Sequence, residues 1–310
     1  RNLQRKCSSE TGNLVHDSSR LIPSYHSTHY AHLRKKFMKK KLVFLLFLAL
    51  ICIGIEYETK TYTLGELSGK AYGIIGLAAL LALLYIVPAS LIILHVQKKW
   101  KTPLASLIIA FLGGLFIAGW TSGLANTYIH DGVSTLSISF INDLESAIVA
   151  PLVEEPLKLI GVAFALYLVP VKNLKSILLL GIVAGFGFQI SEDFSYILSD
   201  MSEGFSFAIS GILGRVVGSI ASHWLYTGLT AFGLTLMIRY RKKNASNFKT
   251  GLIYFLAAFI LHFIWNSPFS AIETEIPLVR PILSALAIFT FFLAYQTATR
   301  LDNDQPSLHF

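Results

Sequence analysis

The chain has 310 residues, of which 54% are hydrophobic and 14% are charged. Because a soluble domain carries about 25% charged residues, this composition excludes an ordinary water-soluble enzyme. The net charge of +8 comes from the N-terminal 41 residues, which hold ten Lys or Arg and two acidic residues. The rest of the chain holds sixteen basic and sixteen acidic residues. A neutral body of this kind argues against a nucleic-acid-binding protein.

The first 41 residues are polar, are rich in Ser and His, and show no apolar periodicity, which predicts a disordered tail. The basic run over 34–41 borders the first apolar segment, where it favours a cytoplasmic anchor. Met38 is a candidate start, in which case the residues before it would not belong to the native protein. Cys7 and Cys52 offer no framework for disulfides or a thiolate metal site.

Eight apolar segments, most of them near the roughly 20 residues of a membrane-crossing helix, follow the tail. The expected spans are 42–56, 72–96, 104–125, 146–169, 175–198, 215–238, 249–269 and 278–298. Lys and Arg gather in the loops after the second, fourth and sixth spans, which places both termini in the cytoplasm. The fold class is therefore all-α, a polytopic transmembrane bundle of about eight spans over 42–300, followed by a short cytoplasmic tail at 301–310. Residues 205–214 are too short to cross alone and are expected to be interfacial or re-entrant.

The span 146–169 carries Glu154, Glu155 and Lys158 within APLVEEPLKLIG. An ionisable side chain in the hydrocarbon core costs at least ~2.5 kcal/mol, so each needs a physical reason. Lys158 is three residues from Glu155 and four from Glu154, so the three share a helix face. Since one lysine cannot neutralise two glutamates, a surplus carboxylate remains, which indicates a functional site.

The next three spans add polar groups at a similar depth. They are Phe188, Glu192 and Asp193, then His223, then His262 with Asn266. At 1.5 Å per residue, the expected topology puts most of them and the glutamates roughly 9–14 Å below the outer surface, so the four spans predict one cavity that opens outwards. We interpret Asp193 as an interfacial acid, and Arg215 and Arg280 as markers of outer boundaries. Asn266 and Thr227 are equally consistent with ordinary interhelical hydrogen bonds.

These segments, in this order, resemble the PrsW family of intramembrane proteases, within the superfamily that includes CAAX prenyl proteases and bacteriocin-processing enzymes. The E-E-x-x-K motif is similar to 154–158 and the F-x-x-x-E motif to 188–192, whereas the usual H-x-x-x-D appears as 262–266 with Asn at its end, a departure towards the CAAX branch. The resemblance covers about 145–270 and implies the catalytic core of an intramembrane endopeptidase there. Its expected catalytic residues are Glu154, Glu155, Glu192, His223 and His262, supported by Lys158, Phe188 and Asn266.

Two mechanisms fit these residues. In the first, Glu154 or Glu155 is the general base that activates a water, while His223 or His262 stabilises the oxyanion. In the second, His223, His262 and Glu192 hold Zn²⁺, and another glutamate activates the bound water. No H-E-x-x-H signature is present, and we slightly favour the route without metal.

The resemblance also implies a substrate and a location. The expected partner is a single-pass membrane protein, such as an anti-sigma factor that is cut near the outer face to start a stress response. The expected location is the lipid bilayer of a bacterial plasma membrane, with no nucleic acid as partner. The alternatives are a transporter or channel, which predicts a polar path continuing to the cytoplasm, and a CAAX-type processing protease.

Overall fold

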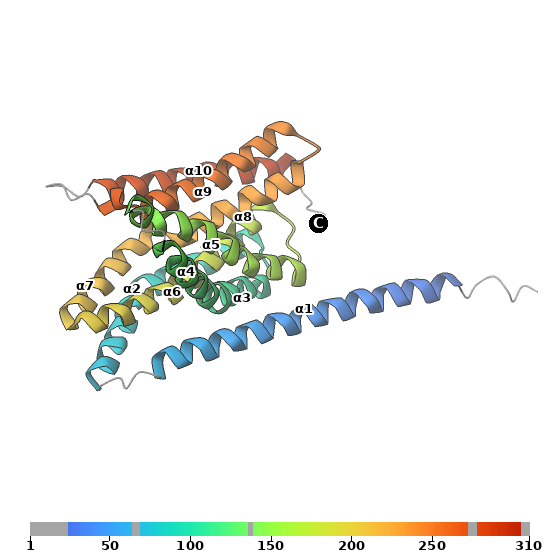
Figure 1. Ribbon diagram of the computed structural model, residues 1–310. Coiled ribbons are helices and arrows are strands. Elements are labelled where there is room, and N and C mark those ends of the chain that lie inside the picture. The colour runs from blue at the N-terminus through green and yellow to red at the C-terminus, as the bar shows by residue number, and fades with distance from the viewer. Residues whose placement is uncertain (1–23, 64–68, 136–138, 272–277, 305–310) are drawn as a thin grey trace, which may run out of the picture. The chain divides into compact units, whose positions relative to one another are not determined.

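The computed structural model describes residues 24–63, 69–135, 139–271 and 278–304. Throughout these ranges the chain forms helices and no strands (Figure 1), which confirms the all-α prediction. The chain divides into two compact units at Leu42. The first unit contributes the start of the first helix, where the Lys41 ammonium lies 4.5 Å from the centre of the Phe37 ring. The second unit, from Val43 onward, holds the rest of α1 and all the other helices.

The helices satisfy their own backbone hydrogen bonds, as apolar segments must where water is absent. In chain order they are α1 (Ser24–Thr63), α2 (Gly69–Trp100), α3 (Leu104–Leu112), the π-helical turn η1 (Gly113–Ala118), α4 (Gly119–Ser134), α5 (Ser139–Leu168), α6 (Leu174–Glu203), α7 (Phe205–Gly218), the 3₁₀ turn η2 (Ser219–Ala221), α8 (His223–Tyr240), α9 (Ala245–Asn266), the 3₁₀ turn η3 (Pro268–Ala271) and α10 (Val279–Asp304). The segment predicted as 104–125 is therefore longer than expected, because α3, η1 and α4 run on without interruption.

Within the described residues, seven helical stretches are long and apolar enough to cross a membrane, so the protein is a multi-pass membrane protein. Helix α5 is 30 residues long but carries three charged side chains near its centre, at 154, 155 and 158, and is not among the seven. Counting α5 as a further span gives the predicted number of eight. The N-in, C-in orientation stays a prediction.

The start of α1 differs from the predicted disordered tail, since the helix already begins at Ser24. Once the apolar segment nucleates a helix, each added residue gains a hydrogen bond, so the helix extends back through the Lys-rich run. Residues 1–23 and 305–310 lie outside the described residues, and the predictions for them stay predictions.

The predicted span 215–238 is interrupted. Helix α7 ends at Gly218, η2 follows, and α8 starts afresh at His223, because the backbone at Ser222 leaves the helical region with φ −144° and ψ −140°. The segment 205–214 forms most of α7, which packs on α2 and α6. Whether this segment is re-entrant stays a prediction.

Helix α6 is the centre of the bundle, packing against α2, α3, α5, α7, α8 and α10. Two of its glycines allow α8 to approach closely. A Cβ at Gly181 would lie 2.6 Å from the Thr227 carbonyl oxygen, and one at Gly185 would collide with the backbone of His223. A third close crossing joins Gly161 of α5 to Gly113 of η1. The functional side chains of α5, α6 and α8 are therefore drawn together by backbone contacts.

Candidate active site

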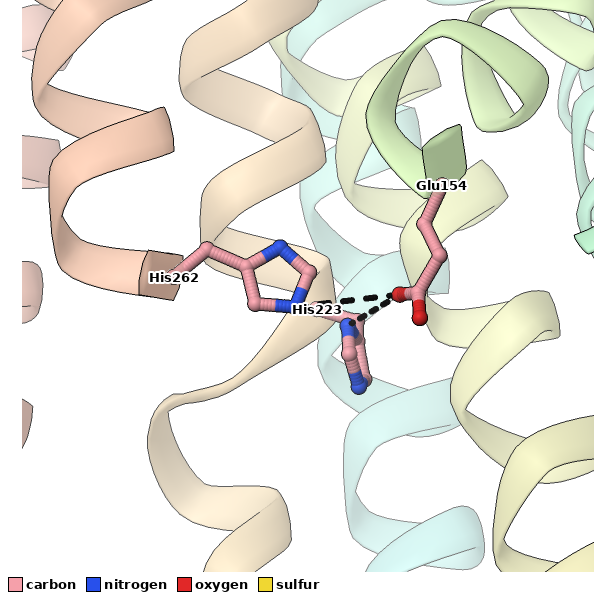
Figure 2. A group of neighbouring side chains, drawn as sticks. All are labelled: Glu154, His223 and His262. Carbon is pink, nitrogen blue, oxygen red and sulfur yellow. Dashed lines mark ion pairs between the residues drawn. The ribbon is translucent and has the colours of Figure 1, made fainter. Parts of the chain in front are cut away.

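Side chains from α5, α6, α8 and α9 meet inside the bundle. The structure brings together all five expected catalytic residues, which are Glu154, Glu155, Glu192, His223 and His262. Glu155, Lys158 and His262 are fully buried, and Glu154 and His223 are nearly so. Figure 2 shows Glu154, His223 and His262 pointing towards one another from three different helices.

Lys158 is the positive centre of this cluster. Its Nζ lies 3.1 Å from Glu154 Oε2, 2.9 Å from Glu155 Oε1 and 2.9 Å from His223 Nδ1. It also lies 3.9 Å from the centre of the Phe188 ring, a cation–π contact that strengthens when the groups are desolvated. The first two sequence motifs therefore meet at one ammonium.

The contacts of His223 fix its tautomer. Lys158 can only donate, so Nδ1 of His223 accepts, and Nε2 carries the proton. Nε2–H donates to Glu192 Oε2 at 2.8 Å. The imidazole is therefore held at both nitrogens, by α5 on one side and by α6 on the other.

Glu155 is enclosed by hydrogen-bonding groups. Its Oε2 accepts from the hydroxyls of Thr227 at 3.0 Å and Thr230 at 3.3 Å, while Oε1 faces Lys158 and lies 3.2 Å from His262 Nδ1. Thr227, for which the sequence left an ordinary interhelical hydrogen bond open, thus bonds a site carboxylate. Glu155 has its acceptors engaged and does not line the cavity described next.

A cavity of about 960 Å³ leads to the cluster. Glu154, Phe188, Glu192 and His223 line it, as does Asn266, whose side chain forms no hydrogen bond in the described part of the chain. Of the two adjacent glutamates, Glu154 faces the cavity, with Glu155, Lys158 and His262 buried behind it.

Three of these side chains offer a metal site. One ligand atom each from Glu154, His223 and His262 lies within 4.8 Å of the others, with Glu154 Oε2 3.8 Å from His223 Nδ1 and 3.7 Å from His262 Nε2. The three ligand atoms are therefore close enough together to hold one ion. Glu192, expected as a ligand, is not in this set.

His262 supplies an independent observation. Its Nε2 is buried and has no hydrogen-bond partner among the described residues, whereas Nδ1 lies 3.2 Å from Glu155 Oε1. Buried polar atoms are rarely left unpaired without a reason, and imidazole is a common metal ligand. The Lys158 ammonium contacts one ligand atom of Glu154 and one of His223. The donor set therefore fits a metal ion once Lys158 has released these two atoms.

Arg215 and Asp193 belong to the site in a way that the sequence did not predict. Arg215 Nη1 lies 3.3 Å from Glu192 Oε2 and 3.6 Å from Asp193 Oδ1. Asp193 is buried, contrary to its interpretation as an interfacial acid, and accepts hydrogen bonds from Tyr85 and Gln189, both at 2.8 Å. Tyr85 lies 108 residues away, so no local pattern could reveal the contact.

Asn126 is another residue that sequence reasoning missed. It lies on α4 and lines the cavity, and its Nδ2 is 3.4 Å from Glu154 Oε1. The predicted end of that span at 125 had left it outside the bundle. Arg280 also lines the cavity, near the ring of Trp265.

One comparison with known proteins identifies a relationship. A family model described as PrsW family intramembrane metalloprotease matches residues 102–295, well over half of the chain and every residue of the cluster. No curated protein and no solved structure matches.

Proposed function

This chain belongs to the PrsW family of intramembrane metalloproteases, a family of membrane-embedded peptidases, and we propose that Glu154, His223 and His262 form its catalytic metal centre. One observation carries the proposal. Glu154 faces the cavity at the point where both imidazoles converge on it, whereas Glu155 is buried against Thr227. The two glutamates therefore have different roles.

We propose zinc as the ion, since two histidines and a carboxylate form a typical catalytic zinc set. When bound, zinc would polarise the scissile carbonyl and lower the pKa of its water. The charge of the cluster supports a divalent cation, because four buried or partly buried carboxylates, at 154, 155, 192 and 193, stand against two fixed cations, Lys158 and Arg215. The surplus of two negative charges matches one such ion.

The remaining residues have roles that follow from their contacts. Glu192 lines the cavity, and its Oε2 is occupied by His223 and Arg215, which leaves Oε1 to take the proton of the attacking water. Asn266 lines the cavity and its amide makes no hydrogen bond in the described part of the chain, so we assign it the role of donating to the oxyanion. Lys158 neutralises the buried Glu155.

The substrate that we propose is a single-pass membrane protein, cut near the outer face of a bacterial plasma membrane, with an anti-sigma factor as the leading candidate. The cavity supports an enzyme over a transporter or channel. Behind Glu154, the described residues Glu155, Lys158 and His262 are all inaccessible, so the polar path ends at the cluster.

The test compares Glu154→Gln with Glu155→Gln in the full chain reconstituted in lipid vesicles. The substrate is a reporter with one apolar span and a tag at each end, and cut sites are mapped by mass spectrometry. Glu154→Gln should lower kcat by at least about 100-fold, whereas Glu155→Gln should lower thermal stability and leave the folded fraction active. Full cleavage by Glu154→Gln would refute the proposal.

A second measurement decides the metal. We expect about one zinc per wild-type chain, loss of zinc in His262→Ala, loss of cleavage on chelation, and recovery when zinc is added back. If chelation leaves cleavage intact while Glu154→Gln abolishes it, Glu154 is the general base of a metal-free reaction.

A further inference from the structure

We propose that Arg215 is a positioning residue for this reaction, acting through Glu192 to set the orientation of His223. The inference rests on the proposed function. Arg215 lies on α7, outside the motifs that carry the family resemblance, and its guanidinium faces the cavity.

Arg215 and His223 bind the same carboxylate oxygen. Glu192 Oε2 lies 3.3 Å from Arg215 Nη1 and accepts from His223 Nε2 at 2.8 Å. Two donors on one oxygen stop the carboxylate from rotating, so the imidazole that depends on it keeps its direction. A ligand whose partner is fixed in this way binds metal more tightly, since such partners typically contribute 10–100-fold in affinity or activity.

Arg215 is itself held in place. Its guanidinium stacks 3.5 Å from the centre of the Tyr196 ring and lies near Asp193, whose carboxylate is fixed by Tyr85 and Gln189. Tyr196, Asp193 and Gln189 all belong to α6, and Tyr85 belongs to α2. The arginine is therefore a preorganised part of the site and differs from a mobile surface charge.

The break in the helix explains how the two donors meet. Arg215 and His223 are eight residues apart, which would separate them by roughly 12 Å along a continuous helix. Instead the chain leaves the helix at Ser222, whose hydroxyl donates to Gln189, and Gln189 in turn bonds Asp193. One network on α6 therefore anchors both the arginine and the residue that precedes His223.

Arg280 offers a matched control. It lines the same cavity, and its guanidinium lies 5.8 Å from the centre of the Trp265 ring. In the described ranges it has no ion pair with a carboxylate. Arg280→Met removes the same charge from the cavity wall without touching Glu192, so it separates positioning from a general electrostatic effect.

The experiment compares Arg215→Met, Arg215→Lys and Arg280→Met in full-length protein. We expect Arg215→Met to lower kcat of reporter cleavage by about 10–100-fold at unchanged KM, Arg215→Lys to recover part of it, and Arg280→Met not to reproduce the loss. A substrate-independent readout is carbethoxylation of His223 by diethylpyrocarbonate, followed by mass spectrometry. Its rate should rise several-fold in Arg215→Met alone.

Two outcomes would overturn the inference: an unchanged kcat with an unchanged His223 modification rate, or a rise in KM alone, which would make Arg215 a substrate-binding residue. If Arg215→Met folds poorly, Arg215→Met/Asp193→Asn removes a stranded carboxylate and is tested in the same way. A fall in unfolding temperature with kcat and His223 reactivity intact would indicate a purely structural role. Failure of the proposed function appears separately, as full cleavage by Glu154→Gln.

Discussion

Replacing Lys158 by Met tests how the buried cluster is stabilised. The substitution keeps an unbranched side chain but removes an ammonium with three hydrogen bonds, to Glu154, Glu155 and His223. Glu155 is fully buried, so its charge would remain without its main counter-ion. Breaking a buried ion pair in this way typically costs about 3–5 kcal/mol of unfolding free energy, and we expect Lys158→Met to fall in that range.

The partner variant sharpens the test. In Glu155→Gln the side chain can still accept from Thr227 and Thr230, and the double variant Lys158→Met/Glu155→Gln has no stranded charge at either position. The double variant should therefore be more stable than Lys158→Met alone. Coupling between directly contacting residues of one network is usually about 0.5–3 kcal/mol, and we expect the upper part of that range.

The assay is reversible unfolding in mixed detergent micelles, followed by circular dichroism, with exposed Lys172→Met as the control. Surface changes of this kind usually stay within about 0.5 kcal/mol. A cost below about 1 kcal/mol for Lys158→Met, or additive single changes in the double variant, would refute the view that Lys158 and Glu155 form a buried pair.

Two further predictions concern the framework. Gly185→Ala should lower kcat and cost about 1–3 kcal/mol of stability, because its Cβ would collide with the His223 backbone. Gly76→Ala has open space around its Cβ, so it should leave kcat unchanged and raise stability by at most about 1 kcal/mol. Cleavage and unfolding assays on both variants test this, and equal effects would contradict it. Asp302→Ala should lower the free energy of unfolding by about 1 kcal/mol, since its carboxylate accepts from the Leu174 and Lys175 backbone N–H groups at the start of α6. An unfolding assay measures this loss. A large loss of kcat in the folded protein would show that the cap does more than stabilise the helix.

The membership of the cluster could be predicted from the sequence because charge in an apolar span is costly. Each of Glu154, Glu192 and His223 had to find a polar partner, and helical spacing limited where such partners could lie. The structure supplies the partner of Glu154 from one turn further along α5 and pairs His223 of α8 with Glu192 of α6. The cost of placing a charge in an apolar span, more than any single motif, therefore allowed these residues to be predicted from the sequence.

The break before α8 could not be predicted, because hydropathy describes 205–240 as one continuous apolar stretch. At the break Ser222 bonds Gln189 of α6, and a tertiary contact of this kind leaves no periodic pattern in the sequence. The contribution of Asn126 was hidden for a related reason. Helix α4 continues the apolar segment through a π-helical turn, so this polar residue joins the cavity wall.

The adjacent glutamates also explain why the first motif contains two acids. Consecutive residues on a helix point about 100° apart, so Glu154 and Glu155 cannot both face the cavity. Lys158 lies one turn later, within reach of both, and its pairing with Glu155 forms a buried, nearly neutral unit against α8. That unit leaves Glu154 as the one carboxylate of the motif that is both close to a positive charge and open to substrate. The second acid therefore makes it possible to bury a lysine beside Glu154 and His223.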